Sequence, residues 1–159
     1  MTVIAFDGVT LASDSRCTDG ADNNEVRKIW RLKNGYLFGG AGEAGFCAAV
    51  RHWLEISIGR KRSPDKPSIY GDTLPTFAGL LIRPDGMCFL LDPHLAPIET
   101  LGGPQAVGSG ASHAITLMRN GHSAASAVKT IVDQQLADGV GGAIQTITLR
   151  RKRARTPAR

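Results

Sequence analysis

Residues 2–16 read TVIAFDGVTLASDSR, and this stretch decides the fold class of the 159-residue chain. Two short β-prone runs, Thr2–Phe6 and Val9–Ser13, are separated only by Asp7-Gly8. An Asp-Gly pair between two such runs is the strongest short-range signal for a β-hairpin. The chain is therefore expected to open with two antiparallel strands, with Asp14 just past the end of the second.

Two further strand pairs are predicted along the chain. An alternating strand at Glu25–Leu32 turns at Asn34-Gly35 into Tyr36–Phe38, and Phe77–Ile82 pairs with Met87–Leu91 around a Pro-Asp-Gly turn. Strands joined by such short turns are antiparallel, because parallel neighbours need a crossover of roughly a dozen residues or more. The spacing therefore excludes a parallel βαβ sheet.

Three helices and a closing strand complete the predicted domain. The first helix follows a glycine-rich bend at Gly39–Gly45 and keeps helical apolar spacing to Ser57. The second runs to about Asn120, and the third begins at a Ser123 cap. Loops are expected at 18–24, 59–73 and 93–103, and the turn at 138–142 leads into a strand at 143–149. This order indicates a single antiparallel α+β domain over residues 1–149.

The net charge of +5 is concentrated at one end of the chain. Residues 150–159, RRKRARTPAR, contain six bases and no acid, whereas residues 1–149 contain 13 bases and 14 acids. We expect a nearly neutral domain and a disordered, solvated tail, Arg150–Arg159. Such a tail can bind nucleic acid. Nucleic-acid binding is disfavoured as the main function, because aromatic residues for base stacking make up only 6%.

Several other classes of protein are disfavoured by composition. No apolar run approaches the ~18 residues of a membrane helix, and the chain does not start with a basic-then-apolar leader. We therefore expect a cytoplasmic protein without a membrane partner. Three cysteines without a CxxC pair argue against a disulfide framework, and Cys17 and Cys47 are interpreted as small apolar groups. The four histidines lack metal-ligand spacing, so neither a metal nor a cofactor is expected.

Two familiar motifs are only partly matched by residues 107–113, VGSGASH. They begin like the dinucleotide motif GxGxxG, but His113 replaces the third glycine. Ser109 is not a hydrolase nucleophile elbow either, since Val107 and Ala111 stand where GxSxG needs glycines. A turn before a helix explains this stretch without either chemistry.

Thr2 follows the initiator methionine, and a small second residue generally permits removal of that methionine. Removal would leave a hydroxyl and a free α-amine on one residue. The α-amine has a pKa of about 7.7–8.0, so it can act as a general base for the hydroxyl near neutral pH. An ordinary strand start is the alternative, and Thr2 alone does not decide between the two.

Three other residues favour the catalytic interpretation. Lys28 shares the predicted face of its strand with apolar neighbours, and Asp14 ends an apolar strand, so the two are expected to pair. A lysine ammonium near the Thr2 amine would lower the pKa of that amine and keep it unprotonated. The glycines around Gly42 allow a tight backbone whose N–H can face a developing oxyanion.

Five stretches, in order, resemble the proteasome β-subunit family, especially its bacterial HslV-type and phage-encoded members. They are TVIAF…LASDSR, EVRKIWRL, FGGAGEAG, AVGSGASHA and DGVGGAIQTITL, and together they span nearly all of residues 2–149. The resemblance implies a four-layer αββα sandwich, with two antiparallel sheets between helices. It also implies a threonine-type endopeptidase acting on peptides or unfolded proteins, a homo-oligomeric ring and, in some members, an AAA+ unfoldase partner.

The resemblance also implies roles for six residues. Thr2 resembles the nucleophile, Asp14 and Lys28 the paired aspartate and lysine, and Gly42 the glycine whose amide forms the oxyanion hole. Ser109 resembles the serine that hydrogen-bonds near the nucleophile's amine. Asp138 corresponds to an aspartate that precedes a Ser-Gly-Gly turn in the family, although Val140 replaces that serine here.

Other departures from the family pattern keep three alternatives open. Val3 replaces the usual threonine after the nucleophile, Ala111 replaces a serine, and the loop 59–73 stands where a second long helix is expected. The chain is therefore either an active peptidase, a catalytically inactive scaffold that retains Met1, or an N-terminal-nucleophile amidase acting on a small amide.

Overall fold

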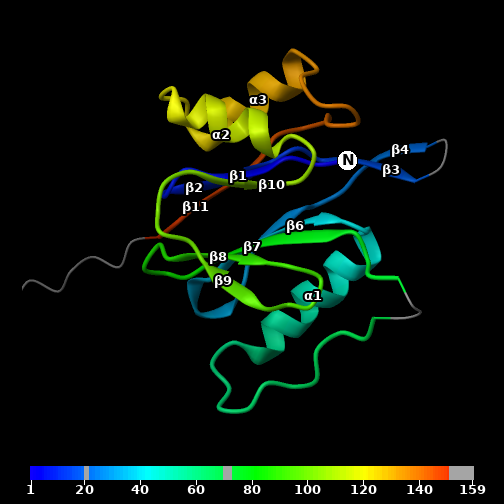
Figure 1. The fold of residues 1–159 in the computed structure, drawn as a ribbon, viewed down its shortest axis with the longest axis vertical. Coiled ribbons are helices and arrows are strands. Elements are labelled where there is room, and N and C mark those ends of the chain that lie inside the picture. Colours follow the sequence, from blue (N-terminus) through cyan, green and yellow to red (C-terminus); the bar gives the residue numbers. More distant parts are fainter. Residues whose placement is uncertain (20–21, 70–72, 151–159) are drawn as a thin grey trace, which may run out of the picture.

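The computed structural model describes residues 1–19, 22–69 and 73–150, and these residues form four layers (Figure 1). Two antiparallel sheets make the middle layers. Helices α2 (Ala111–Arg119) and α3 (Ala124–Asp133) cover one side, and α1 (Ala44–Ser57) covers the other. The expected α+β class and αββα sandwich are confirmed. Apart from Arg150, the expected basic tail lies outside the described residues.

The strand order of each sheet shows where the N-terminal hairpin lies. The first has the order β10-β1-β2-β11, so the N-terminal hairpin occupies its centre, and the second has the order β5-β6-β7-β8-β9. The first contains β1 (Ile4–Phe6), β2 (Thr10–Ser13), β10 (Gln105–Val107) and β11 (Gln145–Thr148). The second contains β5 (Ile29–Arg31), β6 (Leu37–Gly42), β7 (Phe77–Ile82), β8 (Cys88–Leu91) and β9 (Pro97–Glu99). Every pairing among these strands is antiparallel.

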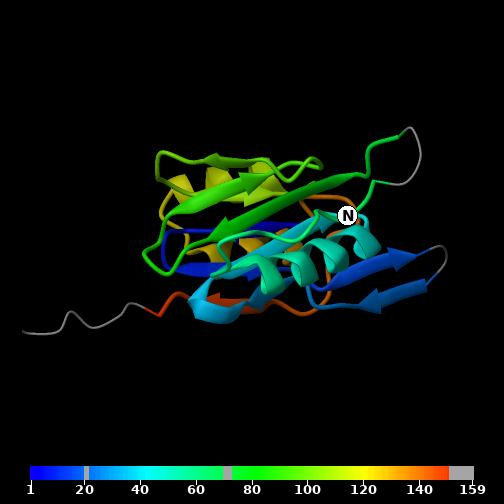
Figure 2. The ribbon, with the colours of Figure 1, turned by 90° about the horizontal axis from the view of Figure 1, so that it is seen from below.

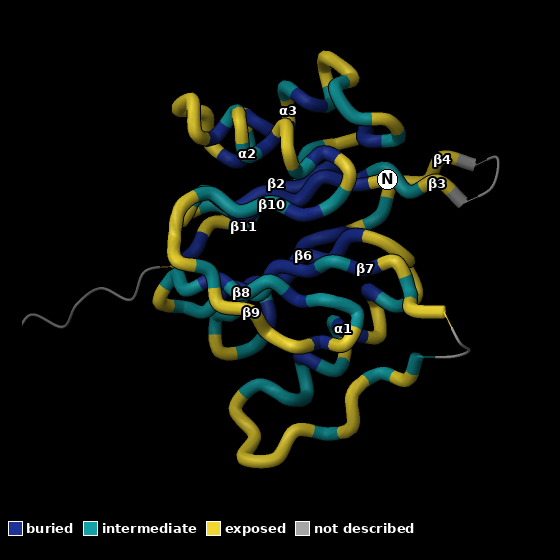
Figure 3. Tube along the Cα trace, in the orientation of Figure 1, coloured by how far each residue is buried: buried dark blue, intermediate teal, exposed yellow. Residues whose placement is uncertain are grey.

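Burial on both faces explains why the first strands are continuously apolar. Ile4 and Phe6 point into the core between the two sheets, whereas Val3 and Ala5 pack under α2 and α3. A separate cluster around Phe38 fills the space between the second sheet and α1. Figure 3 shows the buried strands in the centre and the exposed loop that follows α1. The sandwich therefore rests on three apolar layers, one at each interface between neighbouring layers.

The N-terminal hairpin forms as predicted, with a different turn centre. Asp7 N donates to Thr10 O, so Gly8 and Val9 are the central residues, and Gly8 has a φ of +94°. The Asp7 carboxylate accepts hydrogen bonds from Val9 N and Thr10 N at 2.9 and 2.7 Å. Its other oxygen accepts from Ala124 N at 2.8 Å, which fastens the turn to the start of α3.

The strand predicted at Glu25–Leu32 is wrong in its extent. Glu25 ends β4 (Asp22–Glu25), which pairs with β3 (Arg16–Asp19), whereas β5 begins only at Ile29. Residues 26–28 therefore lie between two strands of different sheets. The loop expected at 18–24 is wrong for the same reason, because its ends belong to the β3–β4 hairpin. Figures 1 and 2 show this hairpin projecting beyond the sheets, close to the N-terminus.

Two other boundaries differ from the sequence prediction. The glycine-rich stretch 39–45 is mostly strand, because β6 continues to Gly42 and α1 starts at Ala44. The irregular segment expected at 93–103 contains the edge strand β9. The helix boundaries near Asn120 and Ser123 are confirmed, and Ser123 Oγ accepts from Ser126 N at 3.1 Å.

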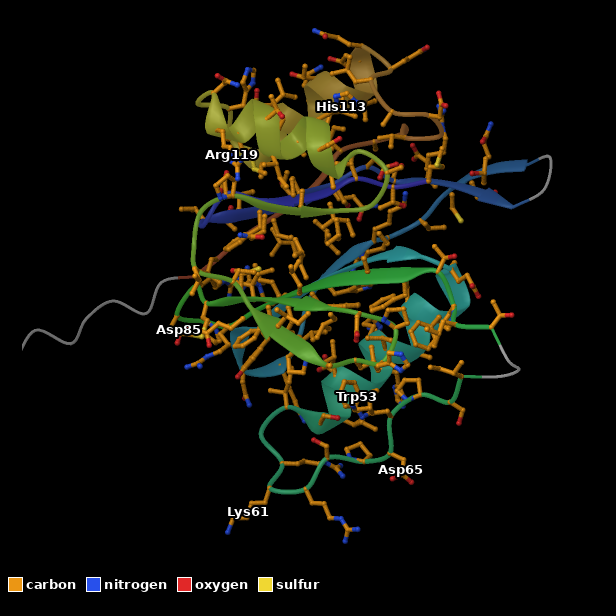
Figure 4. All side chains as sticks on the ribbon, viewed as in Figure 1. Trp53, Lys61, Asp65, Asp85, His113 and Arg119 are labelled. Carbon is orange, nitrogen blue, oxygen red and sulfur yellow. The ribbon has the colours of Figure 1, made fainter. Side chains whose placement is uncertain are left out.

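The outer surface carries the histidines and the loop after α1. His113 lies on the exposed side of α2 (Figure 4), and the other three histidines are also exposed. Trp53 of α1 donates from Nε1 to Pro64 O at 3.0 Å, which ties the following loop to the helix. Among the described residues, no helix has the length and apolar character needed to cross a membrane.

Candidate active site

Lys28 is the centre of the site, and it is buried with only 6% of its surface exposed. Its Nζ donates to Thr2 Oγ1 at 2.8 Å, to Asp14 Oδ1 and Oδ2 at 3.0 and 3.1 Å, and to Met1 O at 3.3 Å. The ammonium thus joins the hydroxyl of the second residue to a carboxylate from the end of β2. The structure brings together the three residues that the sequence predicted as one unit.

Asp14 is fully buried and surrounded by donors. Besides Lys28, its Oδ1 accepts from Val3 N at 3.0 Å and its Oδ2 accepts from Gly141 N at 3.1 Å. These hydrogen bonds compensate the carboxylate for its lost hydration. They also fix its orientation, because the donors come from both ends of the chain. A buried ion pair held in this way has little freedom to rearrange.

Burial lowers the pKa of Lys28 below its ordinary value, because desolvation disfavours the ammonium form. The negative charge of Asp14 and its hydrogen bond act in the opposite direction, but they do not fully compensate. The ammonium is therefore less stabilised than that of an exposed lysine. It retains one interaction with a reactive group, the Thr2 hydroxyl.

Thr2 is buried, with 7% of its surface exposed, and Ser109 contacts its backbone on both sides. Thr2 N donates to Ser109 Oγ at 3.2 Å, and Ser109 Oγ donates to Thr2 O at 3.3 Å. The Thr2 hydroxyl donates to Met1 O at 2.8 Å, while Met1 itself is 57% exposed. The nitrogen and the hydroxyl of Thr2 thus have different fixed partners, Ser109 and Lys28.

Gly42 closes the site at the end of β6. Its φ is +116°, and a Cβ built on it would lie 1.9 Å from Thr76 O. No other residue type fits there without moving the backbone. The neighbouring Glu43 N donates to that same Thr76 oxygen at 2.8 Å, which holds the turn between β6 and α1 against the start of β7.

Asp138 occupies a different position from the other five predicted residues. It is exposed, and in the described part of the chain no hydrogen bond joins its side chain to Thr2, Lys28 or Asp14. Its turn does reach the site through Gly141, which binds Asp14. The turn also reaches Met1, since a Cβ on Gly139 would lie 2.8 Å from Met1 Cβ. The catalytic role of Asp138 stays a prediction.

Sequence reasoning missed two contributors, Gly141 and Gln145. Gln145 Oε1 accepts from Lys28 N at 3.2 Å, and Gln145 Nε2 donates to Val26 O at 2.6 Å. The glycine pair in DGVGG was a signal for close backbone approach at Gly141. No local pattern pointed to Gln145, because its partners lie more than a hundred positions earlier in the chain.

A cavity of about 540 Å³ opens beside Thr2 and Lys28. Its walls include Trp30, Gly40 and Cys47. Burial raises the pKa of the Cys47 thiol to about 11, so this thiol is neutral near pH 7 and unsuited to be a nucleophile. This agrees with its interpretation as a small apolar group, whereas Cys17 lines the same cavity and is only half-buried. The space next to the Thr2 hydroxyl can admit a side chain of a bound molecule.

The four layers are arranged as in solved structures of the HslV type. No protein-family model and no curated protein matches the sequence. Two solved structures share the fold over nearly their whole lengths. BPH from Thiobacillus denitrificans, in complex with epoxomicin, has a TM-score of 0.69 and 18% identity, covering 96% of this chain and 100% of its own. HslV from Trypanosoma brucei has a TM-score of 0.68 and 16% identity, covering 94% and 99%. The fold implied by the sequence resemblance is therefore confirmed.

Proposed function

We propose that this chain is a threonine-type endopeptidase whose nucleophile is Thr2, exposed as the N-terminal residue after removal of Met1. One observation carries the proposal: the Nζ of a buried lysine lies 2.8 Å from Thr2 Oγ1 while it bridges both oxygens of Asp14. A hydroxyl in contact with a desolvated cation is easier to deprotonate than one in water, because the alkoxide form is stabilised by the nearby charge.

The proposed reaction begins with the α-amine that removal of Met1 creates on Thr2. The Lys28 ammonium lowers the pKa of this amine, which therefore accepts the proton from Thr2 Oγ1 as the oxygen attacks the peptide carbonyl carbon. The C–N bond then breaks, and the protonated amine gives its proton to the leaving amine. An ester between Thr2 and the acyl half of the substrate remains, and water hydrolyses it with the same amine as base.

Three other residues have supporting roles in this proposal. The Gly42 N–H is the donor to the oxyanion that forms at the attacked carbonyl, and its positive φ and lack of a side chain make that approach possible. Asp14 balances the charge of Lys28. Ser109 Oγ, which contacts Thr2 N at 3.2 Å, orients the amine toward the hydroxyl.

The resemblance to ring-forming peptidases extends the proposal to the assembly. We propose a homo-oligomeric ring in the cytoplasm that encloses the sites and accepts peptides or unfolded chains, with an AAA+ unfoldase as a possible partner. The structural neighbours, HslV and the BPH complex with epoxomicin, support a peptidase over a binding module. Retention of Met1 would instead favour an inactive scaffold, because Thr2 N would then be an amide without basicity.

The test combines the mass of the purified protein with activity on a fluorogenic peptide library. We expect the intact mass to lack one methionine, and we expect epoxomicin to add covalently to wild type but not to Thr2→Ala. Thr2→Ala should abolish cleavage and leave assembly unchanged, whereas Thr116→Ala, which removes an exposed hydroxyl from α2, should be fully active. Full activity of Thr2→Ala, or of wild type shown to retain Met1, would falsify this mechanism. Activity on small amides alone would favour an amidase.

A further inference from the structure

Residues 26–28 carry Lys28 into the site without belonging to a strand. β4 ends at Glu25 and β5 begins at Ile29, so regular sheet pairing does not fix this segment. Two of its backbone groups bind other backbone groups: Val26 N donates to Ser15 O at 2.8 Å, and Gly40 N donates to Lys28 O at 3.2 Å. The position of the Lys28 Cα therefore also depends on what holds two further backbone groups on either side of Arg27, Val26 O and Lys28 N.

The side chain of Gln145 holds both of these groups. Its Oε1 accepts from Lys28 N at 3.2 Å, and its Nε2 donates to Val26 O at 2.6 Å. The two partners determine which end of the amide is oxygen, because an N–H needs an acceptor and a carbonyl needs a donor. A primary amide presents a donor and an acceptor side by side, as the backbone of a neighbouring strand does. Gln145 thus takes the place of a missing strand partner.

Gln145 contacts the backbone of Lys28 and also lies close to Asp14 in the sheet. It lies in β11, directly opposite Ser13 of β2, and Asp14 is the next residue after Ser13. Two residues shortly before Gln145 also bind residues of the site or next to it. Gly141 N donates to Asp14 Oδ2, and Ala143 N donates to Glu25 Oε1 at 2.9 Å. One short stretch of chain is therefore tied to the carboxylate, to the end of β4 and to the backbone of the lysine.

We propose that Gln145 is a positioning residue that sets the reach of Lys28 to Thr2 by clamping the backbone of residues 26–28. A lysine side chain has four rotatable bonds, so its Nζ reaches a fixed point only when the Cα and the direction of the Cα–Cβ bond are fixed. The clamp supplies that constraint. Its catalytic consequence rests on the proposed function, but its geometric consequence does not.

The kinetic test compares Gln145→Met and Gln145→Ala with wild type, after active sites are titrated with epoxomicin. Methionine keeps the length of the side chain and removes both hydrogen-bonding ends. We expect kcat to fall about 10–100-fold with KM changed by less than about twofold, because a displaced Lys28 affects the reaction rather than substrate binding. Gln105→Met in β10 is the matched control, since the Gln105 side chain donates to the nearby Gly102 O and, among the described residues, to no group of the site.

A second kinetic signature separates positioning from stability. With Lys28 displaced, the Thr2 amine loses part of the cationic influence that lowers its pKa, so the acid limb of the kcat/KM profile should move to higher pH in both Gln145 variants. A purely structural role would reduce the number of titrated sites and leave this limb in place. A lower melting temperature with wild-type kcat per titrated site and an unshifted profile would overturn the proposal.

Crystal structures of wild type and Gln145→Met supply a readout that needs no activity. We expect the distance from Lys28 Nζ to Thr2 Oγ1 to lengthen from 2.8 Å to beyond about 3.5 Å, while Asp14 stays on Val3 N and Gly141 N. An unchanged Lys28 in that variant would refute the clamp. If wild type neither cleaves peptides nor reacts with epoxomicin, the proposed function fails, and this structural comparison still decides the role of Gln145.

Discussion

Asp14 allows a charged lysine to exist in the interior of this molecule. Its four hydrogen bonds come from Lys28 and from two backbone amides, Val3 N and Gly141 N, so no carboxylate oxygen is left without a donor. Neither charge could be buried alone, because the desolvation of a single ion costs several kcal/mol. The cost of removing either partner should therefore exceed the loss of an ordinary contact.

Removing Lys28 should affect stability and rate together. Lys28→Ala should lower the free energy of unfolding by about 3–5 kcal/mol, because it leaves Asp14 buried without a counter-charge. Asp14→Asn should destabilise by a similar mechanism. Urea unfolding measures both effects.

The rate of the double variant tests whether the two residues act together. The rate of Thr2→Ala/Lys28→Ala should be no lower than that of Thr2→Ala, since the residues act on one step. A substantially slower double variant would show that they act independently.

The lowered pKa of Lys28 predicts how its contribution to stability changes with pH. The unfolded chain has the ordinary lysine pKa of 10.5, so between the lower folded pKa and 10.5 the unfolded state binds more protons. Stability relative to a non-titrating variant should therefore rise as the pH rises through this window. The measurement is the difference in unfolding free energy between wild type and Lys28→Met from pH 7.5 to 10. If the unfolding free energy of wild type instead falls relative to that of Lys28→Met as the pH rises, the pKa of Lys28 is not lowered in the folded state.

At the scale of elements, the N-terminal hairpin is fixed by contacts close in sequence. Its turn depends on the Asp7 carboxylate, which binds Val9 N and Thr10 N, and these partners are at most three positions away. Local chemistry of this kind is readable from sequence, and the hairpin was accordingly predicted. The ends of α2 and α3 were predicted for the same reason, because Gly121 and Ser123 act within one turn.

The elements that sequence could not predict depend on distant partners. The alternation of residues 25–32 is that of a strand, yet the chain leaves β4 at Glu25 and is held at Lys28 by Gln145, 117 positions later. Likewise, one donor to Asp14 Oδ2 is the backbone N–H of Gly141, which lies 127 positions later in the chain. A backbone donor has no residue signature, so spacing alone could not identify it.

Asp7 also joins two elements, and this predicts a measurable stability effect. Its second oxygen accepts from Ala124 N at 2.8 Å, so the carboxylate serves as an additional cap for α3. Asp7→Ala should lower the unfolding free energy by roughly 1–3 kcal/mol, because three backbone N–H groups lose their acceptor. Asp85→Ala, in the exposed turn between β7 and β8, is the control and should cost less. Equal losses in thermal melts of the two variants would contradict the capping role.

For the molecule as a whole, the open side of the site raises the question of what shelters it. The cavity next to Thr2 has a volume of about 540 Å³, and residues such as Gly42 and Glu43 on its rim are exposed. In a single copy this rim is open to solvent and to other chains. Enclosure by further copies of the chain is the arrangement that the family resemblance implies.

Light scattering at micromolar concentration tests this assembly. We expect a mass that is several times the 16.9 kDa of one chain, and we expect it to be unchanged in Thr2→Ala, which loses only a hydroxyl. Sedimentation at several concentrations separates a closed ring from an open-ended series of oligomers, because a closed ring gives one discrete species. A monomer throughout this range would exclude the ring and favour an enzyme that acts on small molecules.

The hydrogen bonds that join residues 141–145 to Asp14, Glu25 and Lys28 have a consequence for the newly made chain. Thr2, Asp14 and Lys28 leave the ribosome early, but the strand that orders them is synthesised more than a hundred residues later. At roughly 5–20 residues per second this delay is on the order of ten seconds. A nascent chain therefore carries Thr2, Asp14 and Lys28 for that time without the contacts that order them, and this arrangement can form only near the end of synthesis.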